Sequence, residues 1–190
     1  MRKNRNLYLL TIIALLFNCC IYKVDKFTPD ELMWYKPFEK TDTVIFLSEN
    51  SEVDTIIFRK NVAETNSTNN FEQGFSKTNF LTVSYDFTKG SYHQFALMGP
   101  NGKRYKQDLL NVSKNSSGYG TFEITFIGTI FNKEQLKKVK IIAEETYFFD
   151  SNKAAYSGMN VEKGIKNFTF NTNFGILKYT DSRNIEWERK

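Results

Sequence analysis

The sequence predicts an all-β domain, built as an antiparallel β-sandwich or barrel of about nine strands with one or two short helices. Aromatic residues make up 16% of the chain, with 18 Phe and 10 Tyr, and such side chains favour strands. Residues 81–87 alternate between apolar and polar side chains, as a strand with one buried face does. Short polar connections separate the apolar segments, and the strand–helix alternation of a parallel sheet is not visible.

The first part of the domain is predicted to hold a short helix and a β-hairpin. Thr28, Pro29 and Glu31 have the order of an N-cap, a first-turn proline and a capping-box glutamate. Segments 42–46 and 54–58 are near repeats of each other, and the polar residues between them favour a hairpin turn. The first of these strands is apolar on both faces, which is typical of a buried strand.

The rest of the domain is predicted to consist of strands joined by turns. Residues 132–138 have the pattern of one helical turn, with Asn132 as its cap. Loops are expected at 61–70, 99–102 and 115–118 because these segments are rich in Asn, Ser, Gly and Pro. The expected strands are 81–87, 91–98, 105–112, 119–131, 139–149, a strand with Phe168 and Phe170, and a hairpin of 174–180 and 185–187.

The beginning of the chain has the pattern of a signal peptide. Residues 2–5 contain three basic side chains and residues 7–17 are almost entirely apolar, the order of an n-region and an h-region. As a helix, this apolar run would be about 16 Å long, against a hydrocarbon core of about 30 Å. We therefore expect a signal peptide at 1–18, a tether at 19–27 and a single β-rich domain at 28–190.

The two cysteines of the chain, Cys19 and Cys20, follow this segment directly. The string LLFNCC resembles a lipobox, the signal of bacterial lipoproteins, which implies diacylglycerol on the cysteine and cleavage just before it. Leu16 suits the position three before Cys19, whereas Asn18 stands where a small residue is usual. Cys19 is therefore the expected lipid attachment site and Cys20 the alternative. An ordinary secretory signal with incidental cysteines is the competing interpretation.

Two further segments resemble small lipoproteins of unknown function from Bacteroidetes-type bacteria. They are TPDELMWYKPFEKTDTVIF, at 28–46, and FGILKYTDSRNIEW, at 174–187. The resemblance implies a cell-envelope location with the lipid anchor in the outer membrane. Residues 21–24 lack an acidic run after the cysteines, and by the same resemblance this favours the periplasmic face.

Composition argues against several function classes. The formal charge is +5, but Arg2, Lys3 and Arg5 lie in the predicted signal peptide, which leaves 23 basic against 21 acidic residues. A net charge of +2 does not favour nucleic acid as a partner. His93 is the only histidine and no His/Cys cluster or glycine-rich phosphate loop occurs, so neither a metal nor a cofactor is predicted.

No catalytic signature stands out in the sequence. On a strand, His93 would point with Phe95 and Leu97 to an apolar face, so we expect a structural role for it. Glu145 is the one weak candidate for a catalytic acid, because the strand 139–149 would place it beside Ile141 and Tyr147 and bury it in part. Exposed aromatic rings would serve binding instead, although each is more often a core residue; the candidates are Trp34, Tyr35, Tyr119, Tyr147 and Trp187.

These observations together predict a lipid-anchored envelope protein without catalytic activity, which binds or scaffolds an envelope protein or a glycan at the membrane surface. The alternatives are a glycan hydrolase that uses two carboxylates and a carrier of apolar ligands. A hydrolase would need two acids about 5–10 Å apart in a cleft, and a carrier would need a hollow barrel.

Overall fold

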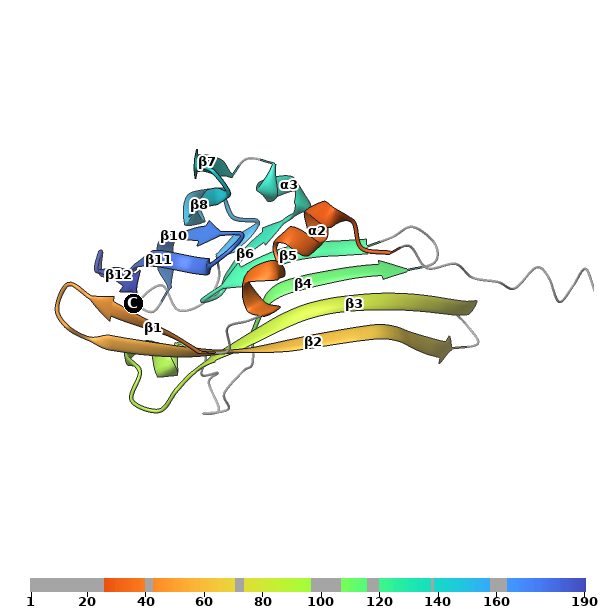
Figure 1. Cartoon of the computed structure of the whole chain (residues 1–190), viewed down its shortest axis with the longest axis horizontal. Coiled ribbons are helices and arrows are strands. Elements are labelled where there is room, and N and C mark those ends of the chain that lie inside the picture. Colours follow the sequence, from red (N-terminus) through yellow and green to blue (C-terminus); the bar gives the residue numbers. More distant parts are fainter. Residues whose placement is uncertain are drawn as a thin grey trace, which may run out of the picture.

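The computed structural model describes residues 26–39, 43–70, 74–96, 107–115, 120–137, 139–157 and 164–190. The predicted signal peptide, both cysteines and the predicted turn at 99–102 lie outside the described residues. Within them the prediction of an all-β fold is confirmed, with antiparallel pairing throughout (Figure 1). The strands are β1 (Thr43–Ser48), β2 (Val53–Asn70), β3 (Gly74–Phe87), β4 (Gln107–Asn115), β5 (Gly120–Phe126), β6 (Thr129–Asn132), β7 (Lys140–Ala143), β8 (Thr146–Asp150), β9 (Tyr156–Ser157), β10 (Ile165–Asn171), β11 (Gly175–Asp181) and β12 (Glu186–Arg189).

The helices are short and lie at the margins of the sheet. Two are α-helical, α2 (Pro29–Met33) and α3 (Lys133–Leu136), and three are 3₁₀ turns, η1 (Lys36–Glu39), η2 (Tyr92–Phe95) and η3 (Ser151–Lys153). Both predicted helix starts are confirmed. Thr28 and Glu31 form a reciprocal capping box on α2, and the Asn132 side chain accepts the backbone N–H groups of Glu134 and Gln135 at the start of α3.

The described strands form one sheet of 12 strands that curls on itself. The strand order is β7-β8-β10-β11-β12-β1-β2-β3-β4-β5-β6-β9, so β7 and β9 are its two edges. Strands β8, β10 and β11 pack against β5 and β6 across the core. Aromatic rings join the two halves: Phe126 and Phe168 have centroids 5.4 Å apart, and Phe131 and Phe149 have centroids 5.0 Å apart. The fold is therefore sandwich-like, but a single continuous sheet supplies both layers.

The strand count exceeds the predicted nine because two predicted strands are hairpins and the short strand β9 was not predicted. The segment 119–131 turns at Ile127 and Gly128, which have φ of 42° and 73° and separate β5 from β6. The segment 139–149 turns at 144–145, where Glu145 has φ of 55°, and this turn separates β7 from β8. Ile127 is apolar and buried although it lies in the turn. The hydropathy pattern of a strand therefore continues through this position, and the sequence gives no sign of the turn.

Three other predictions were wrong. Residues 92–95 form η2 rather than a strand, because the Ser91 hydroxyl bonds both the backbone N–H and C=O of Thr55 and holds the chain in a turn. Residues 61–70 are not a loop but continue β2, which pairs with β3 as far as Asn70 and Gly74. The first strand of the β1–β2 hairpin is buried on one face alone, since Ile45 is 46% exposed.

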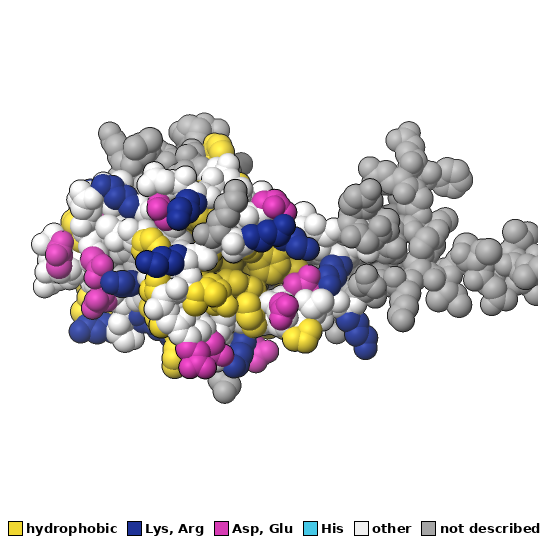
Figure 2. Space-filling view, turned by 90° about the horizontal axis from the view of Figure 1, so that it is seen from above, with side chains coloured by type: hydrophobic (Ala, Val, Ile, Leu, Met, Phe, Trp, Pro, Cys, Tyr) yellow, Lys and Arg dark blue, Asp and Glu magenta, His cyan; other side chains and the backbone are white. Residues whose placement is uncertain are grey.

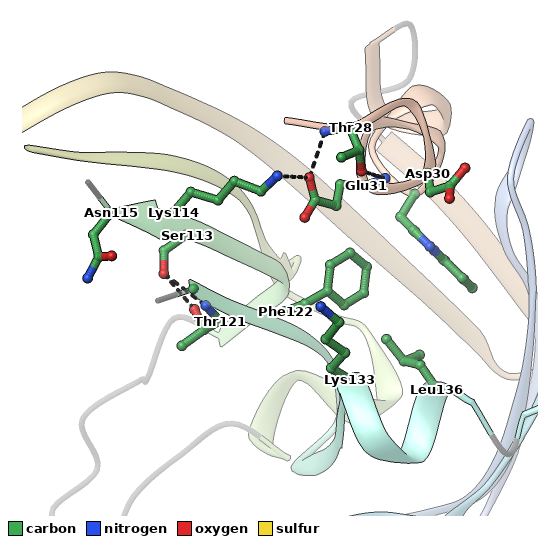
Figure 3. A pocket seen from close by; sticks show the side chains of 12 residues that line it. Thr28, Asp30, Glu31, Ser113, Lys114, Asn115, Thr121, Phe122, Lys133 and Leu136 are labelled. Carbon is green, nitrogen blue, oxygen red and sulfur yellow. Dashed lines mark hydrogen bonds and ion pairs between the residues drawn. The ribbon is translucent and has the colours of Figure 1, made fainter. Parts of the chain in front are cut away.

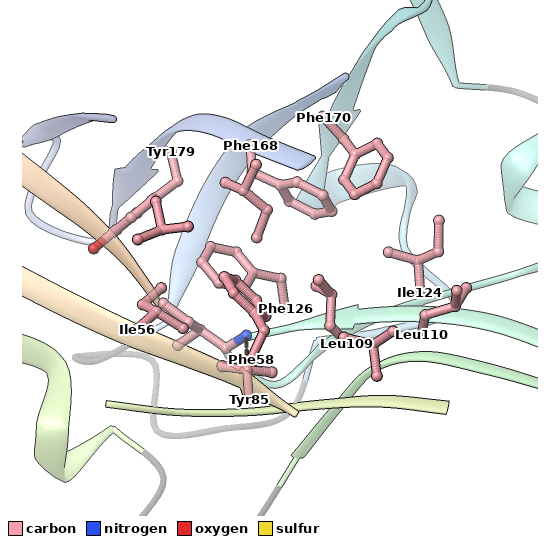
Figure 4. Packing of buried hydrophobic residues seen from close by; sticks show 14 of the residues in the cluster. Ile56, Phe58, Tyr85, Leu109, Leu110, Ile124, Phe126, Phe168, Phe170 and Tyr179 are labelled. Atoms are coloured by element: carbon pink, nitrogen blue, oxygen red, sulfur yellow. Dashed lines mark hydrogen bonds between the residues drawn. The ribbon is translucent and has the colours of Figure 1, made fainter. Parts of the chain in front are cut away.

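The core between the two layers is filled with aromatic and aliphatic side chains (Figure 4). Phe168 stacks on Phe149 at a centroid distance of 4.4 Å. The buried hydroxyl of Tyr85 is satisfied: it donates to Gln107 Oε1 at 2.8 Å and accepts the N–H of Ile127 at 2.6 Å. Burial raises the pKa of Tyr85 far above its ordinary value, so the phenol stays protonated.

Candidate functional site

A groove lies where α2 approaches the end of β4, the start of β5 and the start of α3 (Figure 3). We call it the α2 groove. Its volume is about 520 Å³, and it is lined by Thr28, Asp30, Glu31, Trp34, Ser113, Lys114, Asn115, Gly120, Thr121, Phe122, Lys133 and Leu136. On the face that carries α2 and α3, hydrophobic side chains gather in a central patch with basic and acidic side chains around it (Figure 2).

Polar contacts fix α2 against β4 at one side of this groove. Lys114 forms an ion pair with Glu31 at 2.8 Å and donates to the carbonyl of Lys26 at 3.1 Å. Partial burial by itself would raise the pKa of Glu31, but hydrogen bonds from Lys114 and Thr28 outweigh it and hold the pKa below its ordinary value. The carboxylate is therefore ionised, and the ion pair ties the beginning of the domain to the sheet.

The α2 groove combines an apolar floor with charges at its rim. Trp34, which is 7% exposed, lies beside Phe122 and Leu136 in the lining. Asp30 and Lys133 are exposed, and neither forms an ion pair with another described residue. The groove thus offers apolar surface together with one free charge of each sign.

A second, smaller pocket lies between η2 and the turn that joins β11 to β12. We call it the His93 pocket; its volume is about 200 Å³, and it is lined by Tyr92, His93, Phe95, Ala96, Asp181, Ser182 and Arg183. His93 and Asp181 are 4% and 1% exposed, whereas Tyr92 and Phe95 are 42% and 51% exposed. Buried polar groups and exposed aromatic rings therefore face the same space.

Asp54 on β2 holds His93 in place from the side of the core. This carboxylate is fully buried and accepts three hydrogen bonds, from the backbone N–H of His93 at 2.9 Å, from His93 Nδ1 and from the Tyr179 hydroxyl at 2.5 Å. Burial raises the pKa of Tyr179 well above its usual range, and the charge of Asp54 raises it further. Tyr179 is therefore a fixed donor to Asp54.

Asp181 organises the opposite wall of the His93 pocket. It accepts hydrogen bonds from Arg183 Nε and Nη2 at 3.0 and 2.7 Å, from Trp187 Nε1 at 3.2 Å, and from the backbone N–H groups of Arg183 and Ile185. His93 Nε2 lies 3.7 Å from Asp181 Oδ2 and makes no hydrogen bond within the described residues. The guanidinium of Arg183 also lies 3.9 Å from the centre of the Tyr92 ring.

The protonation of Asp181 predicts a loss of stability in acid. Burial alone would raise the pKa of Asp181, but the hydrogen bonds from Arg183, Ile185 and Trp187 lower it below its ordinary value. A carboxyl group whose pKa is lower in the folded state stabilises the protein above its unfolded pKa of about 4, and the contribution disappears as the pH falls through the folded pKa. We expect the urea-unfolding free energy to decrease as the pH drops below about 4, and Asp181→Asn to weaken this dependence. An unchanged dependence in Asp181→Asn would contradict this origin.

The predicted catalytic acid is not where the sequence placed it. Glu145 lies in the exposed turn between β7 and β8, so the prediction of partial burial was wrong. Its carboxylate accepts a hydrogen bond from the side chain of Asn173. The turn at 144–145 removes Glu145 from the strand face. The apolar pattern of 139–149 gives no sign of this turn. Cys19 and Cys20, the predicted lipid sites, lie outside the described residues.

The aromatic residues that were candidates for binding, and His93, also have surroundings that differ from those expected from the sequence. Trp34 and Trp187 are buried, Tyr35 and Tyr147 are partly buried, and Tyr119 lies outside the described residues. His93 has buried polar neighbours rather than the apolar face of a strand. Sequence reasoning missed Asp54 and Asp181 as its partners. The hint available was that each acid interrupts an apolar strand pattern.

Within the described residues, no helix has the length and apolar character needed to cross a bilayer. Those residues also contain no cluster of three or more His, Cys, Asp or Glu arranged to hold a metal ion. Comparisons with protein-family models, with curated proteins and with solved structures found no match for this chain.

Proposed function

We propose that this chain is a lipid-anchored protein of the cell envelope that binds a partner without catalysis. Cys19, or Cys20 in its place, carries the diacylglycerol that anchors the protein in the outer membrane, on its periplasmic face. The partner binds in the α2 groove. Two acyl chains give stable membrane attachment, at about 0.8 kcal/mol per buried methylene, so the domain needs no membrane-embedded surface of its own.

The observation that carries the proposal is the position of the α2 groove relative to the lipidation motif. The groove is lined by α2, which begins at Pro29 and is the first described helix after the cysteines. A fully extended connection from Cys19 to Pro29 would reach about 35 Å. A ligand in this groove would therefore stay within about 35 Å of the lipid anchor, plus its own distance from Pro29.

The chemistry of the α2 groove favours a segment of another envelope protein as the partner. A peptide can place an apolar side chain on Phe122 and Leu136 and charges of both signs against Asp30 and Lys133. Trp34 is too deeply buried to offer its face to a sugar ring. The filled core gives no support to the alternative of an apolar-ligand carrier.

The hydrolase alternative has weaker support than binding. The two buried acids beside His93, Asp54 and Asp181, are engaged by three and five hydrogen bonds within the described residues. A catalytic acid and base need a proton or a lone pair free for the substrate. Both carboxylates act instead as acceptors for the protein's own groups.

Site-specific photo-crosslinking in intact cells tests the binding role. A photoreactive amino acid in place of Thr121, in the α2 groove, is expected to capture a defined envelope protein, whereas the same group in place of Asn152 on η3 is not. Lys133→Glu should reduce the Thr121 crosslink about tenfold by reversing a rim charge, and Lys153→Glu should leave it unchanged. Equal capture from positions 121 and 152, or no effect of Lys133→Glu, would contradict a partner site in this groove.

A further inference from the structure

The His93 pocket has the composition of a ligand site that is separate from the α2 groove. Tyr92 and Phe95 are three residues apart on η2, and side chains at this spacing eclipse each other along a 3₁₀ turn. Both rings are strongly exposed, at 42% and 51%, although the core takes most other aromatic residues. Exposed aromatic rings beside buried polar groups are typical of binding sites.

The helix that presents these rings is held rigidly. The backbone N–H of His93 is bound to Asp54 at 2.9 Å, and the Ser91 hydroxyl is bound to the backbone of Thr55 at 2.9 and 3.1 Å. Arg183 lies over Tyr92 and pairs with Asp181 and Glu52, so the opposite wall is fixed as well. A ligand would therefore meet a preformed surface, which lowers the entropic cost of binding.

Two polar groups of this pocket have no hydrogen-bond partner within the described residues. One is His93 Nε2, because Asp54 binds the other ring nitrogen, Nδ1. Arg183 uses Nε and Nη2 for Asp181 and Glu52, and its Nη1 makes no hydrogen bond within the described residues. Hydroxyl groups both donate and accept, and they match this pair.

The charges around the pocket exclude the two ionic ligand classes. Asp181 lines the pocket, Glu52 pairs with Arg183 and Asp54 binds His93, so an anion would lie beside three carboxylates. A cation would find no free carboxylate on Asp181, whose oxygens already accept five hydrogen bonds. A neutral ligand avoids both problems, and one with hydroxyl groups and an apolar face also matches the polar groups and the aromatic rings of the pocket.

We infer that the His93 pocket binds one neutral sugar ring. The C–H face of the sugar ring packs on Phe95, beside the Tyr92 ring that Arg183 covers, and the sugar hydroxyls bond His93 Nε2 and accept from Arg183. The volume of about 200 Å³ suits a single pyranose rather than an oligosaccharide. The inference concerns a different pocket from the α2 groove and does not depend on the lipid anchor. Together the two sites would let the protein hold a glycan and an envelope protein at once.

The two tryptophans of the chain allow each site to be observed separately. Trp34 lines the α2 groove, and Trp187 lies next to the His93 pocket, with its ring centroid 5.0 Å from that of His93 and 5.5 Å from that of Tyr92. In the full chain with Trp34→Phe, fluorescence reports on Trp187 alone. We expect a saturable change when glucose, galactose, mannose or N-acetylglucosamine is added, with a dissociation constant of about 1 mM.

Phe95→Ala should weaken this binding about tenfold, which corresponds to 1.4 kcal/mol. Phe174→Ala is the matched control, because Phe174 is 61% exposed and is not in the lining of this pocket. If Trp34→Phe unfolds the chain, saturation-transfer NMR on the wild type and on the two Phe variants gives the same comparison. Absence of binding by all four sugars, equal weakening in both Phe variants, or binding of acetate or a sugar acid alone would overturn the inference. None of these results bears on the lipid anchor or on the α2 groove.

Discussion

Replacing Asp54 by alanine is expected to lower the unfolding free energy by about 3–5 kcal/mol, since the change removes one partner of a buried charged network. The substitution leaves the backbone N–H of His93, its ring Nδ1 and the Tyr179 hydroxyl without their acceptor. Each of these groups is buried, so water does not replace the lost bonds without opening the core. Urea unfolding at neutral pH, followed by circular dichroism, measures the change.

Asp30→Ala is the matched control for Asp54→Ala. Asp30 is exposed on α2 and has no ion pair within the described residues, so its loss should cost less than about 1 kcal/mol, mainly through the helix dipole. A destabilisation by Asp54→Ala no larger than that of Asp30→Ala would mean that the Asp54–His93–Tyr179 contacts do not stabilise the native state.

Phe168→Ala is expected to cost about 3–5 kcal/mol, as other deletions of buried aromatic rings do. Phe168 on β10 is fully buried and joins the two layers of the curled sheet. Its ring lies 4.4 Å from that of Phe149, 5.4 Å from that of Phe126 and 5.9 Å from that of Phe131. Removal of the ring leaves a cavity between the layers that the surrounding strands cannot close fully.

Phe174→Ala again provides the comparison. Phe174 follows the same strand and is 61% exposed, so its truncation should change the unfolding free energy by less than about 0.5 kcal/mol. Thermal unfolding of the two variants beside the wild type is sufficient for the test. Similar midpoints for Phe168→Ala and Phe174→Ala would contradict the packing of the two layers through Phe168.

Local patterns in the sequence predicted those parts of the fold that local forces determine. The alternation over 81–87 identified β3, the repeated segments identified the β1–β2 hairpin, and Thr28 and Asn132 identified the starts of α2 and α3. Each of these signals arises within a few residues, from side-chain alternation or from a cap hydrogen bond.

The missed features depend on contacts that are remote in sequence or on unusual backbone angles. The turn at Ile127 needs positive φ at a residue whose side chain continues the apolar pattern. The turn η2 is selected by Asp54 and Thr55 on β2, and their partners His93 and Ser91 lie almost forty positions later in the chain. The His93 pocket requires Asp181 as well, which the β11–β12 hairpin brings in from the end of the chain.

The same reasoning explains why the candidate sites could not be read from the sequence. Glu145 was selected because a continuous strand would bury it, and the turn between β7 and β8 leaves it exposed. Asp54 and Asp181 interrupt apolar strand patterns, but nothing local in the sequence indicates that they meet at His93, where Asp181 lines the pocket and Asp54 supports it. The proposed lipid anchor differs from these sites, because the proposal for it rests on the sequence of the first twenty residues alone.

Mass spectrometry of the N-terminal peptide, prepared from a native membrane fraction, tests the proposed membrane attachment most directly. The proposal predicts a mature chain that starts at Cys19, or at Cys20, and carries thioether-linked diacylglycerol. An unmodified N-terminus that begins at another residue would contradict it, and the protein would then have to meet its ligands without a lipid anchor.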